Sequence, residues 1–106
     1  MIVRPQLVMI PHAVLADRRL SADTRAMLAF IFAKQRGWRI RRAVLMTALS
    51  HEREPLGRTR IDRMLREAIQ AGYLRRGEWT RGPGGRVTGL EYTVSLPDGA
   101  PWPTSS

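Results

Sequence analysis

The stretch GRTRIDRMLREAIQAGYLRR, residues 57–76, decides the fold, because it contains one amphipathic helix together with its end. Its apolar residues recur at the spacing i, i+3, i+4, i+7, i+8, which is typical of the buried face of a helix. These residues are Ile61, Met64, Leu65, Ala68 and Ile69. Pro55 disfavours helical geometry just before this stretch, and Gly72 is typical of the residue that follows a helix. The pattern therefore predicts a helix from near Arg58 to Gly72.

Directly after Gly72 the spacing of the apolar residues changes from a helical repeat to an alternation of every second residue. The segments YLRRGEWT and RVTGLEYTVSL flank the glycine-rich sequence RGPGG. Two alternating segments joined by such a turn indicate a β-hairpin, and its tip is expected between Arg81 and Arg86.

The N-terminal half predicts a short strand and two further helices. The apolar run QLVMIP, residues 6–11, lies between two prolines and favours an edge strand or an extended arm, followed by about one helical turn. Ser21 as N-cap, Asp23 in the first turn and Gly37 as a stop predict a first helix over residues 22–36. Apolar residues at helical spacing predict a second, shorter helix that contains Ile40 and ends near residue 49 or 50.

The first of these helices has apolar residues on two sides. One stripe contains Leu20, Thr24, Met27, Leu28 and Ile31, and the other contains Ala26, Ala29, Phe30 and Ala33. A helix that is apolar nearly all round must be covered all round. Either the N-terminal strand of the same chain or a second subunit can cover the second stripe, and the sequence leaves both alternatives open.

The expected fold is therefore mainly α with a small β-hairpin, an α+β domain of three main helices, a C-terminal wing and a short N-terminal strand. A length of 106 residues corresponds to one domain. We expect this domain to span residues 1–97. Residues 98–106 contain prolines and no period, and are expected to form a tail that is disordered or lies along the surface.

The charge of the chain favours a polyanionic partner. The formal net charge is +9 and the isoelectric point is about 11.6. Thirteen arginines and five acidic residues lie between Arg36 and Arg86, so the charge is concentrated in the middle of the chain and the hairpin. There is no cysteine, which excludes disulfides and thiolate metal sites. No apolar run is long enough to span a bilayer and no signal peptide is recognisable, so we expect a soluble, cytoplasmic protein.

The polar face of the helix expected over residues 58–72 carries the side chains that base recognition requires. Rotation by about 100° per residue places Thr59, Arg63, Arg66 and Gln70 opposite the apolar face, with Arg60 beside them. Arginine can pair with guanine, and threonine and glutamine can reach base edges or phosphates. The alternative is a solvated helix face with local ion pairs. The basic residues before and after this helix favour DNA over that alternative. The DNA-binding residues expected on this basis are Arg41, Arg42, Thr59, Arg60, Arg63, Arg66, Gln70, Arg81 and Arg86.

The chain also resembles a known family. The segments IPHAVLADRRLSADTRAMLAFI, GWRI, IDRMLREAIQAGYLRR and GGRVTGLEYTVSLP are similar to the winged helix-turn-helix domains of phage, plasmid and prophage replication-type and regulatory proteins, akin to the N-terminal domain of the DnaD-like group. The resemblance implies double-stranded DNA binding in transcription regulation or DNA replication. It also implies that Arg58, Thr59, Arg60 and Arg63 contact DNA.

Other functions have weaker support in the sequence. The segment HERE, residues 51–54, lacks the second histidine of a metalloprotease motif, and RGPGGR lacks the lysine of a phosphate-binding loop. We expect no enzyme activity, no cofactor and no metal. The alternative function is a protein-interaction module that binds a host protein assembly, suggested by Trp38, Trp79 and Trp102. We also expect a homodimer through the N-terminal strand and first helix, with a monomer as the alternative.

Overall fold

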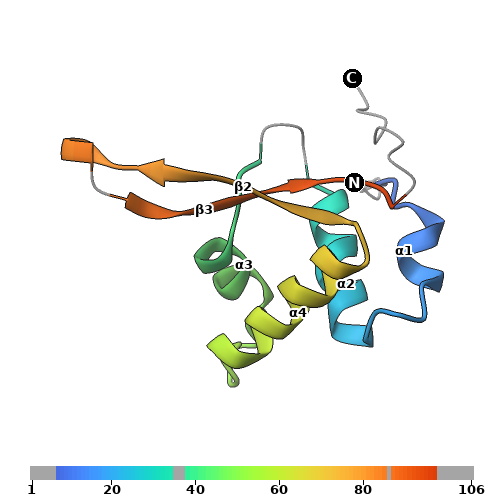
Figure 1. The fold of residues 1–106 in the computed structure, drawn as a ribbon. Helices are drawn as coiled ribbons and strands as arrows, with labels where there is room; N and C mark the ends of the chain where they lie inside the picture. Colours follow the sequence, from blue (N-terminus) through green and yellow to red (C-terminus); the bar gives the residue numbers. More distant parts are fainter. Residues whose placement is uncertain (1–6, 35–37, 86, 98–106) are drawn as a thin grey trace, which may run out of the picture.

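The computed structural model describes residues 7–34, 38–85 and 87–97. In these residues, four α-helices and a three-stranded antiparallel sheet form a small α+β domain (Figure 1). The elements in chain order are α1 (His12–Ala16), α2 (Ala22–Phe32), β1 (Ile40–Arg41), α3 (Arg42–Leu49), α4 (Arg58–Gln70), β2 (Leu74–Arg81) and β3 (Val87–Val94). This order is compatible with the winged helix-turn-helix expected from the sequence. The proposed tail, residues 98–106, lies outside the described residues.

Helix α4 has the bounds and the buried face that its sequence predicts. Ile61, Met64, Leu65 and Ala68 are buried, and Ile69 is partly buried. The helix ends because Gly72 takes a positive φ of 91°. The Tyr73 N–H then donates to the Ala68 carbonyl at 3.0 Å, and the Gly72 N–H donates to the Ile69 carbonyl at 3.1 Å. These two bonds satisfy carbonyls that a helix end leaves without partners.

The hairpin is also confirmed, and it pairs with a third strand that the sequence did not reveal. The strand order is β1-β3-β2, and β2 and β3 extend well beyond the helices (Figure 1). Residues Ile40 and Arg41 pair with Tyr92 and Glu91. The expected helix around Ile40 therefore begins only at Arg42, and Arg41 is in a strand. A strand of two residues has no period of its own, so its pairing with β3 decides its structure.

Helix α2 is shorter than predicted. It ends at Phe32, and Ala33 is its C-cap, whereas the sequence predicted a helix to Arg36. Arg36 and Gly37 lie outside the described residues. Ser21 is the N-cap residue, as predicted, but its hydroxyl makes no capping bond to the helix backbone. The first apolar stripe of this helix is buried, and in the second stripe Ala26 is exposed and Phe30 is partly buried.

The prediction of an N-terminal strand is wrong for the residues that the structure describes. Residues 7–10 belong to no strand, and Leu7 and Met9 are 88% and 66% exposed. The three-stranded sheet contains only β1, β3 and β2 among the described residues, and an extended segment that pairs with none of them forms no ladder. Pro11 follows in extended geometry as the N-cap residue of α1.

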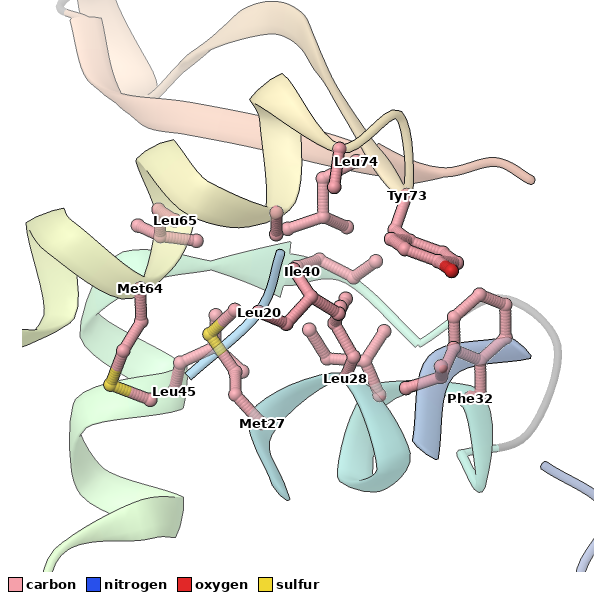
Figure 2. Close-up of a cluster of buried hydrophobic side chains, with 14 of the residues drawn as sticks. Leu20, Met27, Leu28, Phe32, Ile40, Leu45, Met64, Leu65, Tyr73 and Leu74 are labelled. Atoms are coloured by element: carbon pink, nitrogen blue, oxygen red, sulfur yellow. The ribbon is translucent and has the colours of Figure 1, made fainter. Parts of the chain in front are cut away.

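The hydrophobic core lies between the helices and the sheet, and its buried residues come from all four helices and from β1 and β2 (Figure 2). The largest fully buried side chains include Tyr73, Met27, Leu28, Leu45 and Ile61. Burying one such side chain contributes about 1.5–3 kcal/mol to folding. The core thus fixes α4 against α2, α3 and the start of β2, and leaves the opposite side of α4 facing solvent.

Candidate nucleic-acid interface

The solvent-facing side of α4 is a narrow polar stripe that contains Thr59, Asp62, Arg66 and Gln70. All four residues are exposed, and they recur every three or four residues along the helix. Arg58 and Arg60 are exposed beside the stripe in the first turn of α4. Within the described part of the chain, Arg58 and Arg66 have no ion-pair partner. Their guanidinium groups are therefore available to an external acceptor.

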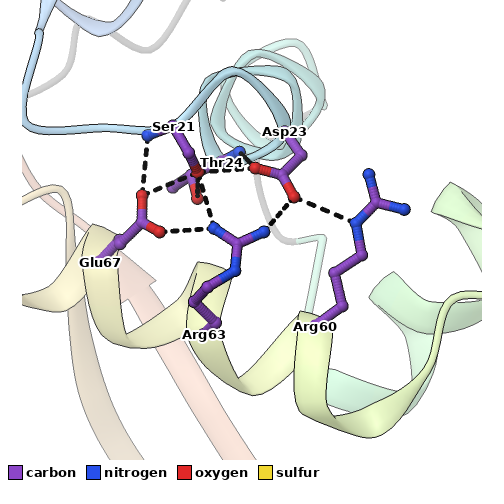
Figure 3. Close-up of polar contacts among 6 residues, drawn as sticks. All are labelled: Ser21, Asp23, Thr24, Arg60, Arg63 and Glu67. Atoms are coloured by element: carbon purple, nitrogen blue, oxygen red, sulfur yellow. Dashed lines mark hydrogen bonds and ion pairs between the residues drawn. The ribbon is translucent and has the colours of Figure 1, made fainter.

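Arg63 lies beside this stripe and binds the N-terminal end of α2. Its Nη1 donates to Ser21 Oγ at 2.8 Å and to Glu67 Oε2 at 2.6 Å, and its Nη2 forms an ion pair with Asp23 (Figure 3). The side chain is partly buried. The sequence placed Arg63 on the face opposite the buried one, with local ion pairs as the alternative to DNA contacts. The structure shows the local pair with Glu67, and it adds partners at the start of α2 that lie 40 residues or more away in sequence.

The carboxylates of this network are held in their charged form. Partial burial opposes ionisation of Asp23, but hydrogen bonds from Ser21, Arg63 and Arg60 outweigh it and hold its pKa well below the usual range. Arg60 contributes through its Nε, which lies 3.0 Å from Asp23 Oδ2. The Ser21 N–H donates to Glu67 at 2.8 Å and is the largest of the contacts that lower the pKa of Glu67. Arg60 and Arg63 thus already neutralise carboxylates of the protein itself.

Arg41 and Arg42 have internal partners as well. Arg42 Nη1 lies 3.2 Å from Asp62 Oδ1, which joins α3 to α4. Arg41 Nη2 lies 3.1 Å from Glu91 Oε1 and joins β1 to β3. The Arg42–Asp62 pair also neutralises the carboxylate within the exposed stripe of α4. Both side chains of that pair are about half exposed, so this ion pair is open to competition from solvent and phosphate.

The hairpin contributes a second group of basic side chains. Arg75, Arg76 and Arg81 in β2 are exposed. Arg81 donates from Nη1 to the Gly85 carbonyl at 3.1 Å, which leaves its charge uncompensated. Arg86 lies outside the described residues. Sequence reasoning missed Arg75 and Arg76 as site residues. Their sequence signal is the pair of arginines directly after Leu74. In the structure Leu74 is buried and begins β2, so the two arginines follow at the edge of the core.

A second polar cluster joins α1 to the turn after α4. The Tyr73 hydroxyl donates to Asp17 Oδ2 at 2.9 Å, and Arg19 forms an ion pair with Asp17 at 2.6 Å. The bonds from Arg19 lower the pKa of Asp17 well below its usual range, and burial raises the pKa of Tyr73. The carboxyl stays ionised and the phenol stays protonated near neutral pH. The contacts of this cluster therefore support a structural role.

The segment HERE lies in the loop between α3 and α4. His51, Glu52, Arg53 and Glu54 are all exposed, and His51 Nδ1 accepts the Arg53 N–H at 3.1 Å. A search of the described residues found no group of three or more histidine and carboxylate side chains arranged to hold a metal ion. None of the described helices has the length and apolar character needed to cross a bilayer.

Comparison of the chain with protein-family models, with curated proteins and with solved structures found no match. The resemblance to winged helix-turn-helix domains therefore rests on the quoted sequence segments and on the order of the elements.

Proposed function

We propose that this protein is a winged helix-turn-helix domain that binds double-stranded DNA in a sequence-specific manner. In this proposal α4 enters the major groove, α3 lies across the backbone and the β2–β3 hairpin is the wing. The observation that carries the proposal is the exposed stripe of α4, in which Thr59, Arg66 and Gln70 face solvent and Arg66 has no ion-pair partner among the described residues.

The side chains of the stripe match the chemistry of base edges. Arg66 can donate two hydrogen bonds to O6 and N7 of guanine, and Gln70 can donate to and accept from adenine. Thr59 and Arg58 lie in the first turn of α4, where short hydroxyl groups and backbone N–H groups meet phosphate oxygens. Arg60 and Arg63 have a different role in this proposal, because their contacts with Asp23 fix the angle between α4 and α2.

The hairpin supplies charge without sequence preference. Arg75 and Arg76 lie near the start of β2, and Arg81 is its last residue. Lysine and arginine contacts to phosphate release condensed counterions, so such residues make binding dependent on salt. The proposed role, a phage- or prophage-type regulator or replication accessory factor, follows from the family resemblance.

Binding of the full chain to a random pool of duplexes, at two salt concentrations, tests the proposal. After selection of a preferred duplex, Arg66→Ala is expected to weaken specific binding by about 1–3 kcal/mol and to relax the preference at one base pair. Arg18→Ala is the matched control, because Arg18 is an exposed arginine in the loop after α1. Equal affinity of the parent for every duplex in the pool, or equal effects of the two substitutions, would contradict the proposal.

A protein-interaction module is the second candidate function, and exposed apolar residues favour it. Leu7, Val8 and Met9 are each at least half exposed, and Val44 lies in a shallow apolar hollow beside Phe30. Trp38 packs edge-on against Phe30, with 5.7 Å between ring centroids, so it is less available than Trp79 as an interface anchor. Trp102 lies outside the described residues. Loss of partner binding in Leu7→Ser, with DNA binding retained, would support this second function.

A further inference from the structure

Trp79 is an exposed aromatic side chain on the projecting part of the hairpin. It is 62% exposed, and it pairs across the sheet with Leu90. Neither residue belongs to the hydrophobic core or packs against it. A large aromatic side chain that the core of the described residues does not cover can bury its ring against a ligand, which makes Trp79 a candidate contact residue.

A β-bulge sets the direction of this side chain. Arg76 pairs with Tyr92 and Trp79 pairs with Leu90, so three steps along β2 match two steps along β3. Directly paired residues share a face of the sheet, and so do residues two apart on a strand. The extra residue therefore places Arg76 and Trp79 on the same face, whereas regular alternation would place them on opposite faces.

Gly77 makes this bulge possible. A Cβ atom at position 77 would lie 2.7 Å from the Glu91 carbonyl oxygen, a distance at which the backbone must shift. The face that Arg76 and Trp79 share is also the face of Tyr92, which pairs with the buried Ile40. It is therefore the face toward the helices, but neither Arg76 nor Trp79 belongs to the hydrophobic core.

The charges around Trp79 select a polyanion as its partner. Arg75, Arg76 and Arg81 are exposed on the same strand, and no ion pair joins them to a carboxylate whose side chain the structure describes. Arg76 shares the face of Trp79, whereas Arg75 is on the opposite face. An indole on the same face as an exposed guanidinium group matches a ligand that presents flat aromatic surfaces along a phosphate backbone. An apolar protein surface would leave these arginines without counter-charge.

We infer that the indole of Trp79 stacks on DNA bases, so that the β2–β3 hairpin contacts the flat faces of bases as well as phosphates. This inference rests on the proposed DNA-binding function and adds a ligand class to it. The base plane is available in two places. The indole either wedges between base pairs of an intact duplex, or stacks on an unpaired base at a bulge or a fork.

Three DNA probes distinguish the wedge from stacking on an unpaired base. They are a short duplex, the same duplex with one central unpaired base, and one of its single strands. Trp79→Ala is expected to weaken binding about ten-fold or more to the probe that presents the base, because stacking on one base contributes on this scale. The loss occurs on the intact duplex if the indole is a wedge, and on the two other probes if it stacks on unpaired bases. Trp79→Phe is expected to restore most of the affinity.

Two further measurements separate stacking from a general loss of structure. The dependence of log K on log salt is expected to be unchanged in Trp79→Ala, because no charge is lost, whereas Arg76→Ala reduces its magnitude by about 0.9. In a chain with Trp38→Phe and Trp102→Phe, the fluorescence of Trp79 is expected to be quenched by the bound probe. Leu15→Ala is the matched control, since Leu15 is 51% exposed on α1, away from the hairpin.

The outcomes distinguish the inference from the proposed function. If the parent binds DNA and Trp79→Ala binds all three probes equally well, the inference is overturned and the proposed function stands. A protein ligand that requires Trp79 while DNA does not also overturns it. If the parent binds none of the probes, the proposed function fails and the inference fails with it.

Discussion

At the scale of single residues, Arg63 is the side chain that joins the two longest helices. One guanidinium group contacts Ser21 and Asp23 at the start of α2 and Glu67 one turn further along α4 (Figure 3). Removing it leaves two carboxylates close together without their shared cation. Arg63 and Arg66 lie one turn apart on α4 and differ in their surroundings, since Arg63 has partners at the start of α2 and Arg66 faces solvent.

Arg63→Ala is expected to lower the thermal midpoint of unfolding by several degrees, because a partly buried network loses a charged donor with three acceptors. Arg66→Ala is the matched substitution one turn away and is expected to leave the midpoint nearly unchanged. Circular dichroism melts of the two variants measure the difference. Equal midpoints would show that the network contributes nothing to stability.

The network also predicts how stability depends on pH. The folded-state pKa values of Asp23 and Glu67 are lowered, so both carboxylates stabilise the fold above their ordinary pKa values of 3.8 and 4.5. As the pH falls below these values, the unfolded chain takes up protons first and stability is lost. Asp23→Asn is expected to show a smaller loss over this acidic range. A parent melting temperature that is constant through the range would contradict this prediction.

The contacts of Arg63 show which features of α4 could be predicted from the sequence and which could not. Rotation along α4 correctly separated its buried residues from its polar ones, because that separation depends only on helical geometry. It could not show that Arg63 turns toward α2, since Ser21 and Asp23 lie at least 40 residues earlier and only the packing of the two helices brings them close.

At the scale of elements, the same distinction between local and distant information holds. Helix α4 and its end at Gly72 were predictable because the apolar spacing and the glycine lie in one stretch of chain. Strand β1 and the lack of a strand at residues 7–10 were not, because a strand forms only where the fold brings an extended segment beside a pairing partner. A run such as QLVMIP has the composition of a strand, but composition does not show whether a partner lies beside it.

The hairpin carries an element-scale prediction about salt. Arg81→Ala is expected to reduce the magnitude of the slope of log K against log salt by about 0.9, because the unpaired charge of Arg81 is available to a phosphate. Arg41→Ala is expected to change the slope little, because Glu91 already binds the Arg41 guanidinium. DNA-binding titrations at several salt concentrations measure both slopes. A larger effect of Arg41→Ala would place the phosphate contacts at the base of the sheet.

At the scale of the whole molecule, several large apolar side chains of the described residues are exposed. Leu7, Val8 and Met9 lie at the N-terminal end of the described chain, and Leu15 on α1 is half exposed. Contiguous apolar surface of this kind is typical of an interface. The expected homodimer therefore stays a prediction, although its basis is now this exposed run and no longer the edge of a strand.

Light scattering at micromolar concentration tests the assembly. We expect a mass of twice the 12.0 kDa of one chain, and a shift toward the monomer in the double variant Leu7→Ser, Met9→Ser. Trp79→Ala is the control, since it removes an exposed apolar side chain from the hairpin. A parent mass near 12.0 kDa, with and without DNA, would show that the protein is a monomer.

The polar side of α4 has an exposed part and a part that contacts α2, and this arrangement affects how the protein can evolve. The residues that hold α4 against α2 and the residues that face outward occupy different sides of one helix, so selection can act on them separately. Under the proposed function, we expect substitutions at Thr59, Arg66 and Gln70 to alter the preferred DNA site at little cost to folding, because these side chains are exposed. We expect substitutions among Ser21, Asp23, Arg63 and Glu67 to depend on one another, because these side chains share one network. A lineage with this domain would then acquire new targets in single steps while the contacts between α2 and α4 are inherited as a unit.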